Sequence, residues 1–167
     1  MTPCAASSTR ALCSEQRPGA RRAENVGALR DDGPMSVKAS GTFDVTGWDE
    51  QAKDTRPDGT VVTRVRVTKT FHGDLAGTSV TEIQTVTTAA GPTAYVGVEC
   101  FEGTLHGRKG TFVLQHSAGN DAAGKEWLRW QIVSTSGTGE LAGLHGEGQI
   151  TVDGDGRHFY ALDYELP

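Results

Sequence analysis

The sequence predicts one all-β domain, an antiparallel sheet of about eight strands that closes into a barrel. Composition is the first observation, because Gly, Thr and Val are frequent and 22 of the 167 residues are glycine. Such a mixture is typical of short strands joined by tight turns. The second observation is that apolar and polar residues alternate along most of residues 36–167, whereas no segment has the periodicity of an amphipathic helix. The third is a Gly-x-Leu-x-Gly pattern that occurs three times.

The first expected strand covers residues 37–48, where Val37, Ala39 and Phe43 share one phase and polar residues take the other. A turn is predicted next at residues 57–59, Pro-Asp-Gly, because Pro fixes one dihedral angle and Gly supplies a positive one. The second strand follows at residues 60–71. The remaining strands are expected at residues 79–88, 94–101, 110–116, 125–134, 146–152 and 158–166, with Gly-containing turns at 120–124 and 153–156.

The repeated Gly-x-Leu-x-Gly pattern lies at residues 73–77, 103–107 and 139–143. Its glycines let the backbone turn sharply, and its leucines, Leu75, Leu105 and Leu141, are expected to plug one end of the core. If each repeat contains two strands, all three turns lie at the same end of the sheet, as in an up-and-down barrel. Closure of that barrel would also remove the exposed strand edges that invite aggregation.

Residues 1–34 differ from the rest of the chain, because they contain several arginines and much Ala and Ser, without strand alternation or a helical stripe. They also lack the apolar segment of a signal peptide. We interpret them as a disordered or spurious N-terminal extension, with Met35 as the natural initiator and residues 35–167 as a single β-barrel domain. The alternative is a lid or targeting arm that folds over the barrel mouth.

Composition and spacing exclude several classes of partner. A formal net charge of -5 is unsuited to a phosphate backbone, so no nucleic-acid partner is expected. No apolar run approaches the roughly 20 residues of a spanning helix, so no membrane partner is expected. The histidines lack metal-ligand spacing, and the Gly-rich residues 136–139 lack the Lys of a phosphate loop, so neither a metal nor a cofactor is expected. Cys100 is the one cysteine in residues 35–167, and we expect its thiol to be a small buried group. Because a single cysteine cannot form an internal disulfide, a cytoplasmic location is also expected.

Four segments together resemble a known family. They are GTFDVTGW at residues 41–48, KTFHGDLAGTS at 69–79, GRKGTFVLQH at 107–116 and SGTGEL at 136–141. Over about residues 35–166 the chain resembles the DUF3224 family, a group of small bacterial proteins without an assigned function. The resemblance implies a fold like that of allene oxide cyclase, an eight-stranded antiparallel barrel, but not the activity of that enzyme. Barrels of this shape include cyclases of reactive intermediates and dirigent-like proteins, and fold alone does not assign a function.

Three ionisable residues are the candidates for catalysis, because each lies in phase with apolar residues on a different strand: Lys69, Glu99 and His116. A Lys at an inward position either pairs with a carboxylate or lies at the barrel rim. Burial would raise the pKa of Glu99 and make it a general acid or base near neutral pH. The alternative for Glu99 is a structural carboxylate paired with Lys or Arg, or an outward residue. His116 is suited to proton transfer, and a structural histidine is its alternative.

Four further residues are the candidates for ligand contact: Trp48, Tyr95, Gln115 and Trp130. Aromatic side chains inside a barrel would suit a flat or conjugated apolar molecule, with ordinary core packing as the alternative. Gln115 and His116 are adjacent and should point to opposite faces, and the apolar residues that precede His116 in phase favour His116 as the inward one.

Three functions remain open from the sequence. The first is a cofactor-free isomerase or cyclase acting on a small apolar metabolite, which predicts an open cavity containing Glu99 or His116 and loss of turnover in Glu99→Gln. The second is a binding barrel without catalysis, in which ligand binding survives that substitution. The third is a structural protein with a filled core, which predicts no cavity large enough for a ligand. Pairing of copies through their outer faces into a homo-oligomer is a further expectation.

Overall fold

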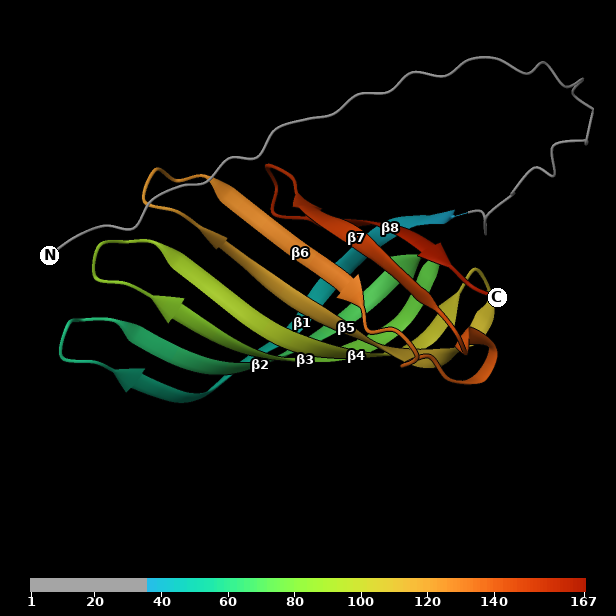
Figure 1. Ribbon diagram of the computed structural model, residues 1–167, viewed down its shortest axis with the longest axis horizontal. Helices are drawn as coiled ribbons and strands as arrows, with labels where there is room; N and C mark the ends of the chain where they lie inside the picture. The colour runs from blue at the N-terminus through green and yellow to red at the C-terminus, as the bar shows by residue number, and fades with distance from the viewer. Residues whose placement is uncertain (1–35) are drawn as a thin grey trace, which may run out of the picture. The chain divides into compact units, whose positions relative to one another are not determined.

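The computed structural model describes residues 36–167, which form an eight-stranded barrel (Figure 1). The strands are β1 (Val37–Thr55), β2 (Val61–Gly73), β3 (Leu75–Thr87), β4 (Thr93–Leu105), β5 (Arg108–Asn120), β6 (Glu126–Ile132), β7 (His145–Val152) and β8 (His158–Glu165). Each strand pairs antiparallel with the next, and β8 pairs with β1 to close the sheet. The predicted fold class is therefore confirmed, whereas the closer comparison with allene oxide cyclase stays a prediction. The expected disordered extension at residues 1–34 lies outside the described residues.

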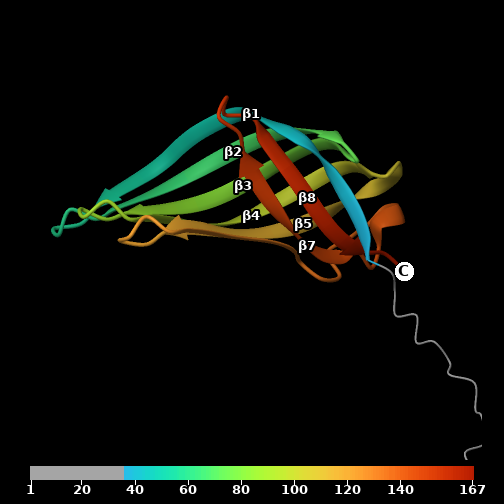
Figure 2. The same ribbon diagram turned by 90° about the horizontal axis from the view of Figure 1, so that it is seen from above.

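The strands differ in length, and this difference makes the two ends of the barrel unlike. β1 has 19 residues and β2 to β5 have 13 each, whereas β7 and β8 have 8 each. The hairpins β1–β2, β3–β4 and β5–β6 therefore extend together beyond β7 and β8, as Figures 1 and 2 show. The interior is consequently less enclosed by strands at the end where these hairpins protrude.

The opposite end of the barrel is closed by the leucines of the repeated pattern. Leu75, Leu105 and Leu141 each have 0% of their surface exposed and belong to the main core cluster. Their turns connect β2 to β3, β4 to β5 and β6 to β7, so they lie at one end of the meander. Both the plugging role and the shared end were predicted, and both are confirmed. The third turn differs from the others, because Gly139–Leu141 forms a short 3₁₀ helix.

The connection between β6 and β7 covers the edge of β5 beyond the end of β6. The backbone N–H of Val133 donates to the carbonyl oxygen of Val113 at 2.8 Å, and the N–H of Thr138 donates to that of Thr111 at 2.9 Å. The Thr138 hydroxyl in turn accepts a hydrogen bond from the N–H of Thr111 at 3.1 Å. The Gly-rich residues 136–139 therefore complete the sheet edge of β5 as part of this connection.

A β-bulge in β1 decides which face Trp48 occupies. Val45 is paired with Lys69 and Gly47 with Thr68, so Thr46 has no partner on β2. Strict alternation from Phe43 would point Trp48 outward, but the extra residue shifts the phase and sets Trp48 opposite the buried Val67. Trp48 consequently joins the inner face near the hairpin end of the barrel.

The interpretation of Cys100 as a buried thiol is wrong, because Cys100 is exposed. Its neighbour Glu99 is fully buried, and adjacent residues of a strand point to opposite faces. Once Glu99 lies inside the barrel, Cys100 must lie on the outer surface. In the described part of the chain, no helix has the length and apolarity to cross a membrane.

Candidate functional site

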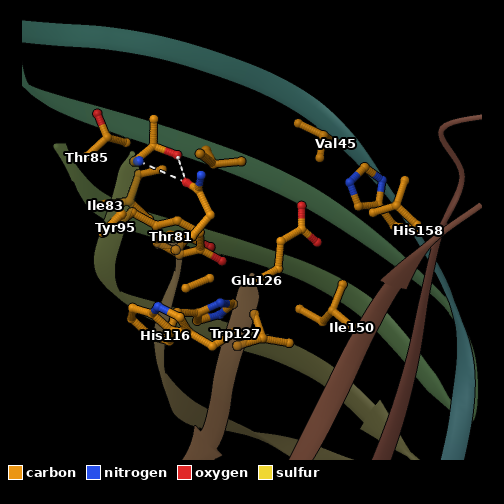
Figure 3. Close-up of a pocket in the computed structure, with 18 of the residues that line it drawn as sticks. Val45, Thr81, Ile83, Thr85, Tyr95, His116, Glu126, Trp127, Ile150 and His158 are labelled. Carbon is orange, nitrogen blue, oxygen red and sulfur yellow. Dashed lines mark hydrogen bonds between the residues drawn. The ribbon is translucent and has the colours of Figure 1, made fainter. Parts of the chain in front are cut away.

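The barrel contains a cavity of about 750 Å³ between the aromatic core and the hairpin end. Its walls are largely apolar, and Figure 3 shows side chains from several strands directed toward it. The apolar wall includes Val67, Ile83, Tyr95, Leu128 and Ile150, with Trp48 among the residues near the mouth. Lys69, Thr81 and His116 also line the cavity and make its floor polar.

The centre of this floor is the carboxylate of Glu99 on β4, which is 0% exposed. The Lys69 ammonium on β2 donates a hydrogen bond to its Oε1 at 3.0 Å, and the Ser79 hydroxyl on β3 also donates to Oε1. His116 Nε2 on β5 lies 2.5 Å from Oε2. Strands β2, β3 and β5 therefore bring an ammonium group, a hydroxyl and an imidazole to one carboxylate on β4.

The pKa of Glu99 moves in the direction opposite to the sequence expectation. Burial by itself raises this pKa, because a charged carboxylate loses its hydration. The hydrogen bond from His116, the positive charge of Lys69 and the hydroxyl of Ser79 outweigh burial and lower the pKa of Glu99 from 4.5 to about 2. This direction contradicts the expectation that Glu99 is an acid or base near neutral pH, and it makes Glu99 a carboxylate that is ionised at neutral pH.

The ionised state of Glu99 determines the tautomer of His116. Trp130 Nε1 lies 2.9 Å from His116 Nε2 and 3.4 Å from Oε2 of Glu99. An indole N–H only donates and a carboxylate only accepts, so an Nε2 that lies 2.5 Å from Oε2 must carry the proton. Trp130 then donates to Glu99. The lone pair of a neutral His116 is left on Nδ1, which makes no hydrogen bond within residues 36–167.

Two hydrogen-bond donors at the floor have unused capacity. The Lys69 ammonium has three protons, and its contacts are Glu99 and the ring of Phe43, whose centroid lies 5.1 Å from Nζ. The Thr81 hydroxyl is buried, and among the described residues it has no hydrogen-bond partner. Thr81 is only 1% exposed and lines the cavity (Figure 3). Both donors belong to residues that line the cavity.

The structure brings most of the predicted residues together. Lys69, Glu99 and His116 form the floor cluster, and the ring of Tyr95 lies 6.5 Å from that of His116, centroid to centroid. Burial raises the pKa of Tyr95 first, and the nearby charge of Glu99 raises it further. Trp130 is 1% exposed and packs beneath His116 in the core.

Two of the four predicted ligand contacts, Gln115 and Trp130, do not line the cavity, and Trp130 belongs to the core instead. Gln115 lies on the outer face, where its side chain donates a hydrogen bond to that of Gln131 at 3.0 Å. It cannot contact a molecule in the cavity, because the adjacent His116 takes the inward position.

Sequence reasoning missed Ser79 and Thr81, although both lie on the inner face of β3. Thr81 is opposite Glu99 in the register between β3 and β4, and Ser79 is opposite Phe101. Their alternation with outward residues was visible in the sequence, but only the register shows that they approach Glu99. Within residues 36–167, no group of three or more His, Cys, Asp or Glu side chains could hold a metal ion.

Comparison with known proteins assigns the barrel to a family. Residues 39–164 match the family model described as "Protein of unknown function (DUF3224)". The chain belongs to the DUF3224 family. The crystal structure of another DUF3224 protein of unknown function, from Shewanella oneidensis MR-1, is similar to this chain, with 35% sequence identity and a TM-score of 0.72. The match covers 80% of the present chain and 99% of that protein. No curated protein matches the sequence.

Proposed function

We propose that this DUF3224 protein binds a small, largely apolar molecule in the barrel cavity. The observation that carries the proposal is the open volume of about 750 Å³ with apolar walls and a polar floor. Ligand sites typically occupy about 300–1,000 Å³ and combine apolar walls with a few placed polar groups. A filled core, the structural alternative, would leave no such volume.

The location of the charged cluster gives independent support. Transfer of Lys69 and Glu99 into the barrel costs hydration energy that an ion pair only partly recovers, so apolar residues would stabilise the fold at least as well. Lys69 and His116 nevertheless lie where the cavity ends. A polar group placed at the end of an apolar pocket is typical of a site that orients a ligand.

The test is binding of the neutral apolar fluorophore N-phenyl-1-naphthylamine to the full chain. Ala118 lines the cavity, so Ala118→Phe fills part of its volume and should weaken binding at least about tenfold. Val98 is 50% exposed on the outer face, and Val98→Phe is the matched control that should leave binding unchanged. Equal affinities in all three proteins would contradict binding in the cavity.

A cofactor-free isomerase or cyclase is the second candidate, and the contact of Glu99 with His116 favours it. Glu99 holds the Nε2 proton, so a neutral His116 has its free lone pair on Nδ1. In this reaction Nδ1 removes a proton from a substrate carbon and returns it to another carbon of the same molecule, so no co-reactant is needed.

Exchange of hydrogen for deuterium tests this second candidate without an identified substrate. The acetyl protons of 2-acetylnaphthalene exchange in D₂O when a base enolises the ketone, and NMR follows their loss. The protein should accelerate this exchange, and His116→Asn should remove the acceleration while N-phenyl-1-naphthylamine still binds. If the protein binds the ketone but does not accelerate the exchange, it is a carrier and not an enzyme.

Two further expectations about the environment remain proposals. We propose a cytoplasmic location, because the described part of the chain contains one cysteine, Cys100, and it is free. We also propose self-association through the outer surface, where Val96 and Val98 are exposed. Light scattering of the purified chain at several concentrations measures this association directly.

A further inference from the structure

We infer that the cavity recognises a neutral carbonyl oxygen on its ligand, through the Lys69 ammonium and the Thr81 hydroxyl. The inference rests on the proposed function, since it requires a ligand in the cavity. It goes further by naming the chemical class, an apolar ketone or conjugated enone, and the two side chains that select it.

The Thr81 hydroxyl is the first step in the argument. Its oxygen is buried without a hydrogen-bond partner in the described residues, and a buried hydroxyl in this state destabilises the folded protein. A valine has the same shape and would avoid that cost. A ligand oxygen in the cavity would supply the missing partner, because Thr81 faces the cavity from the inner side of β3.

The floor offers a ligand more hydrogen-bond donors than acceptors. Both oxygens of Glu99 are occupied, Oε1 by Lys69 and Ser79, and Oε2 by His116 and Trp130. Lys69 keeps at least one ammonium proton beyond its contacts with Glu99 and Phe43. A carbonyl oxygen, which has two lone pairs, can accept from both Lys69 and Thr81, whereas a ligand hydroxyl also needs an acceptor, for which Nδ1 of a neutral His116 is available.

The charges near the cavity favour a neutral oxygen over a carboxylate. Lys69 is the one Lys or Arg that lines the cavity in residues 36–167, and Glu99 already neutralises it. Glu126 also lines the cavity, and Figure 3 shows its carboxylate directed into it. A second anion would meet two carboxylates without a spare ammonium group, so a carbonyl oxygen is the better match.

The experiment compares three probes of one shape with the full chain at neutral pH: 2-acetylnaphthalene, 2-ethylnaphthalene and 2-naphthoate. We expect the ketone to bind about tenfold tighter than the hydrocarbon, which is the value of one good hydrogen bond in a dry site. The ketone should also bind more tightly than the carboxylate. Titration calorimetry measures each Kd.

Variants at Thr81 assign the preference to its hydroxyl. Thr81→Val should remove most of the ketone preference, whereas Thr81→Ser, which keeps the hydroxyl, should retain it. Thr85→Val is the matched control, because Thr85 lines the same cavity on β3 but its hydroxyl already donates to the carbonyl oxygen of Thr63 at 3.4 Å. It should leave the preference unchanged. Urea unfolding checks that each variant is folded.

The outcomes separate the two proposals. Equal affinity for the ketone and the hydrocarbon, or a preference that survives Thr81→Val, would overturn carbonyl recognition and leave binding in the cavity intact. Tighter binding of 2-naphthoate would overturn it in favour of an anion site. Failure of all three probes and of N-phenyl-1-naphthylamine to bind would remove the proposed function, and this inference with it.

Discussion

At the scale of single residues, Glu99 decides the electrostatics of the barrel interior. Its carboxylate is fully buried, yet it stays ionised because Lys69, Ser79 and His116 all donate to it. Removal of one partner of a buried ion pair destabilises a protein more than replacement of both partners by apolar residues. The reason is that the remaining charge then lies unpaired in a medium of low dielectric constant. The cluster therefore contributes more to the specificity of the interior than to net stability.

Replacement of the carboxylate tests this account. Glu99→Gln preserves the shape but leaves the Lys69 ammonium buried beside a neutral amide, so the free energy of unfolding should fall by about 3 kcal/mol. Urea unfolding measures the change. Glu82→Gln is the control, because Glu82 pairs with Arg66 on the exposed outer face and should cost less than about 1 kcal/mol.

The double variant Lys69→Met with Glu99→Gln removes both charges. It should recover a large part of the stability lost in Glu99→Gln, since no uncompensated ammonium remains. Additive losses from the two substitutions would show that the ion pair has no energetic coupling.

The lowered pKa of Glu99 also predicts how stability depends on pH. The pKa is about 2 in the folded protein, below the ordinary value of 4.5 that the unfolded chain should show. The contribution of Glu99 is therefore fully present above pH 4.5 and is lost as the pH falls toward 2. The difference corresponds to roughly 3 kcal/mol. Unfolding curves across this range should have a steeper pH dependence for the native sequence than for Glu99→Gln, and identical slopes would contradict the assignment.

At the scale of structural elements, two features of the repeated turns close one end of the barrel. Each turn presents a leucine to the core, and the glycines allow close approach of neighbouring strands. Gly77 on β3 is paired with Gly103 on β4, and a Cβ atom on Gly77 would lie 2.2 Å from the carbonyl oxygen of Glu102. A larger residue at Gly77 would have to push the two strands apart.

Substitution of a plugging leucine should destabilise the fold without affecting the cavity. Leu105→Ala removes a fully buried side chain at the closed end and should lower the free energy of unfolding by about 3 kcal/mol. Val98→Ala, on the exposed face of the same strand, should cost less than about 1 kcal/mol. Leu105 does not line the cavity, so Leu105→Ala should bind N-phenyl-1-naphthylamine like the native chain. A tenfold loss of affinity would show that the closed end and the cavity are coupled.

At the scale of the whole barrel, the pairing is uneven around the sheet. β6 and β7 are paired only at Trp130 with Gly148 and at Gln131 with Glu147. The register between β2 and β3 is continuous from Val61 to Phe71. The contact of β6 with β7 is therefore the weakest side of the closed barrel, and it lies next to the wall of the cavity.

Hydrogen exchange should detect this weak side. Local opening that separates β6 from β7 breaks few hydrogen bonds, so peptides covering these strands should exchange at least about tenfold faster than those covering β2 and β3. Mass spectrometry of the exchanged protein measures the rates. Uniform protection of all eight strands would indicate that the barrel opens only by global unfolding.

The fold class and the closed end followed from the sequence by itself. Alternation with a period of two identifies strands and their two faces, and it placed Lys69, Glu99 and His116 in phase with apolar residues. The structure buries all three side chains. The leucines of the repeat could be assigned to the core for the same reason, because both signals are local in the chain.

Only the tertiary structure decided how the interior groups meet. The approach of Lys69 and His116 to Glu99 depends on the register between strands, which alternation does not specify. The unpaired Thr81 and the lowered pKa of Glu99 follow from that register. The inward position of Trp48 depends on one unpaired residue in β1. Interstrand hydrogen bonding sets these features, and it joins residues that are distant in the sequence.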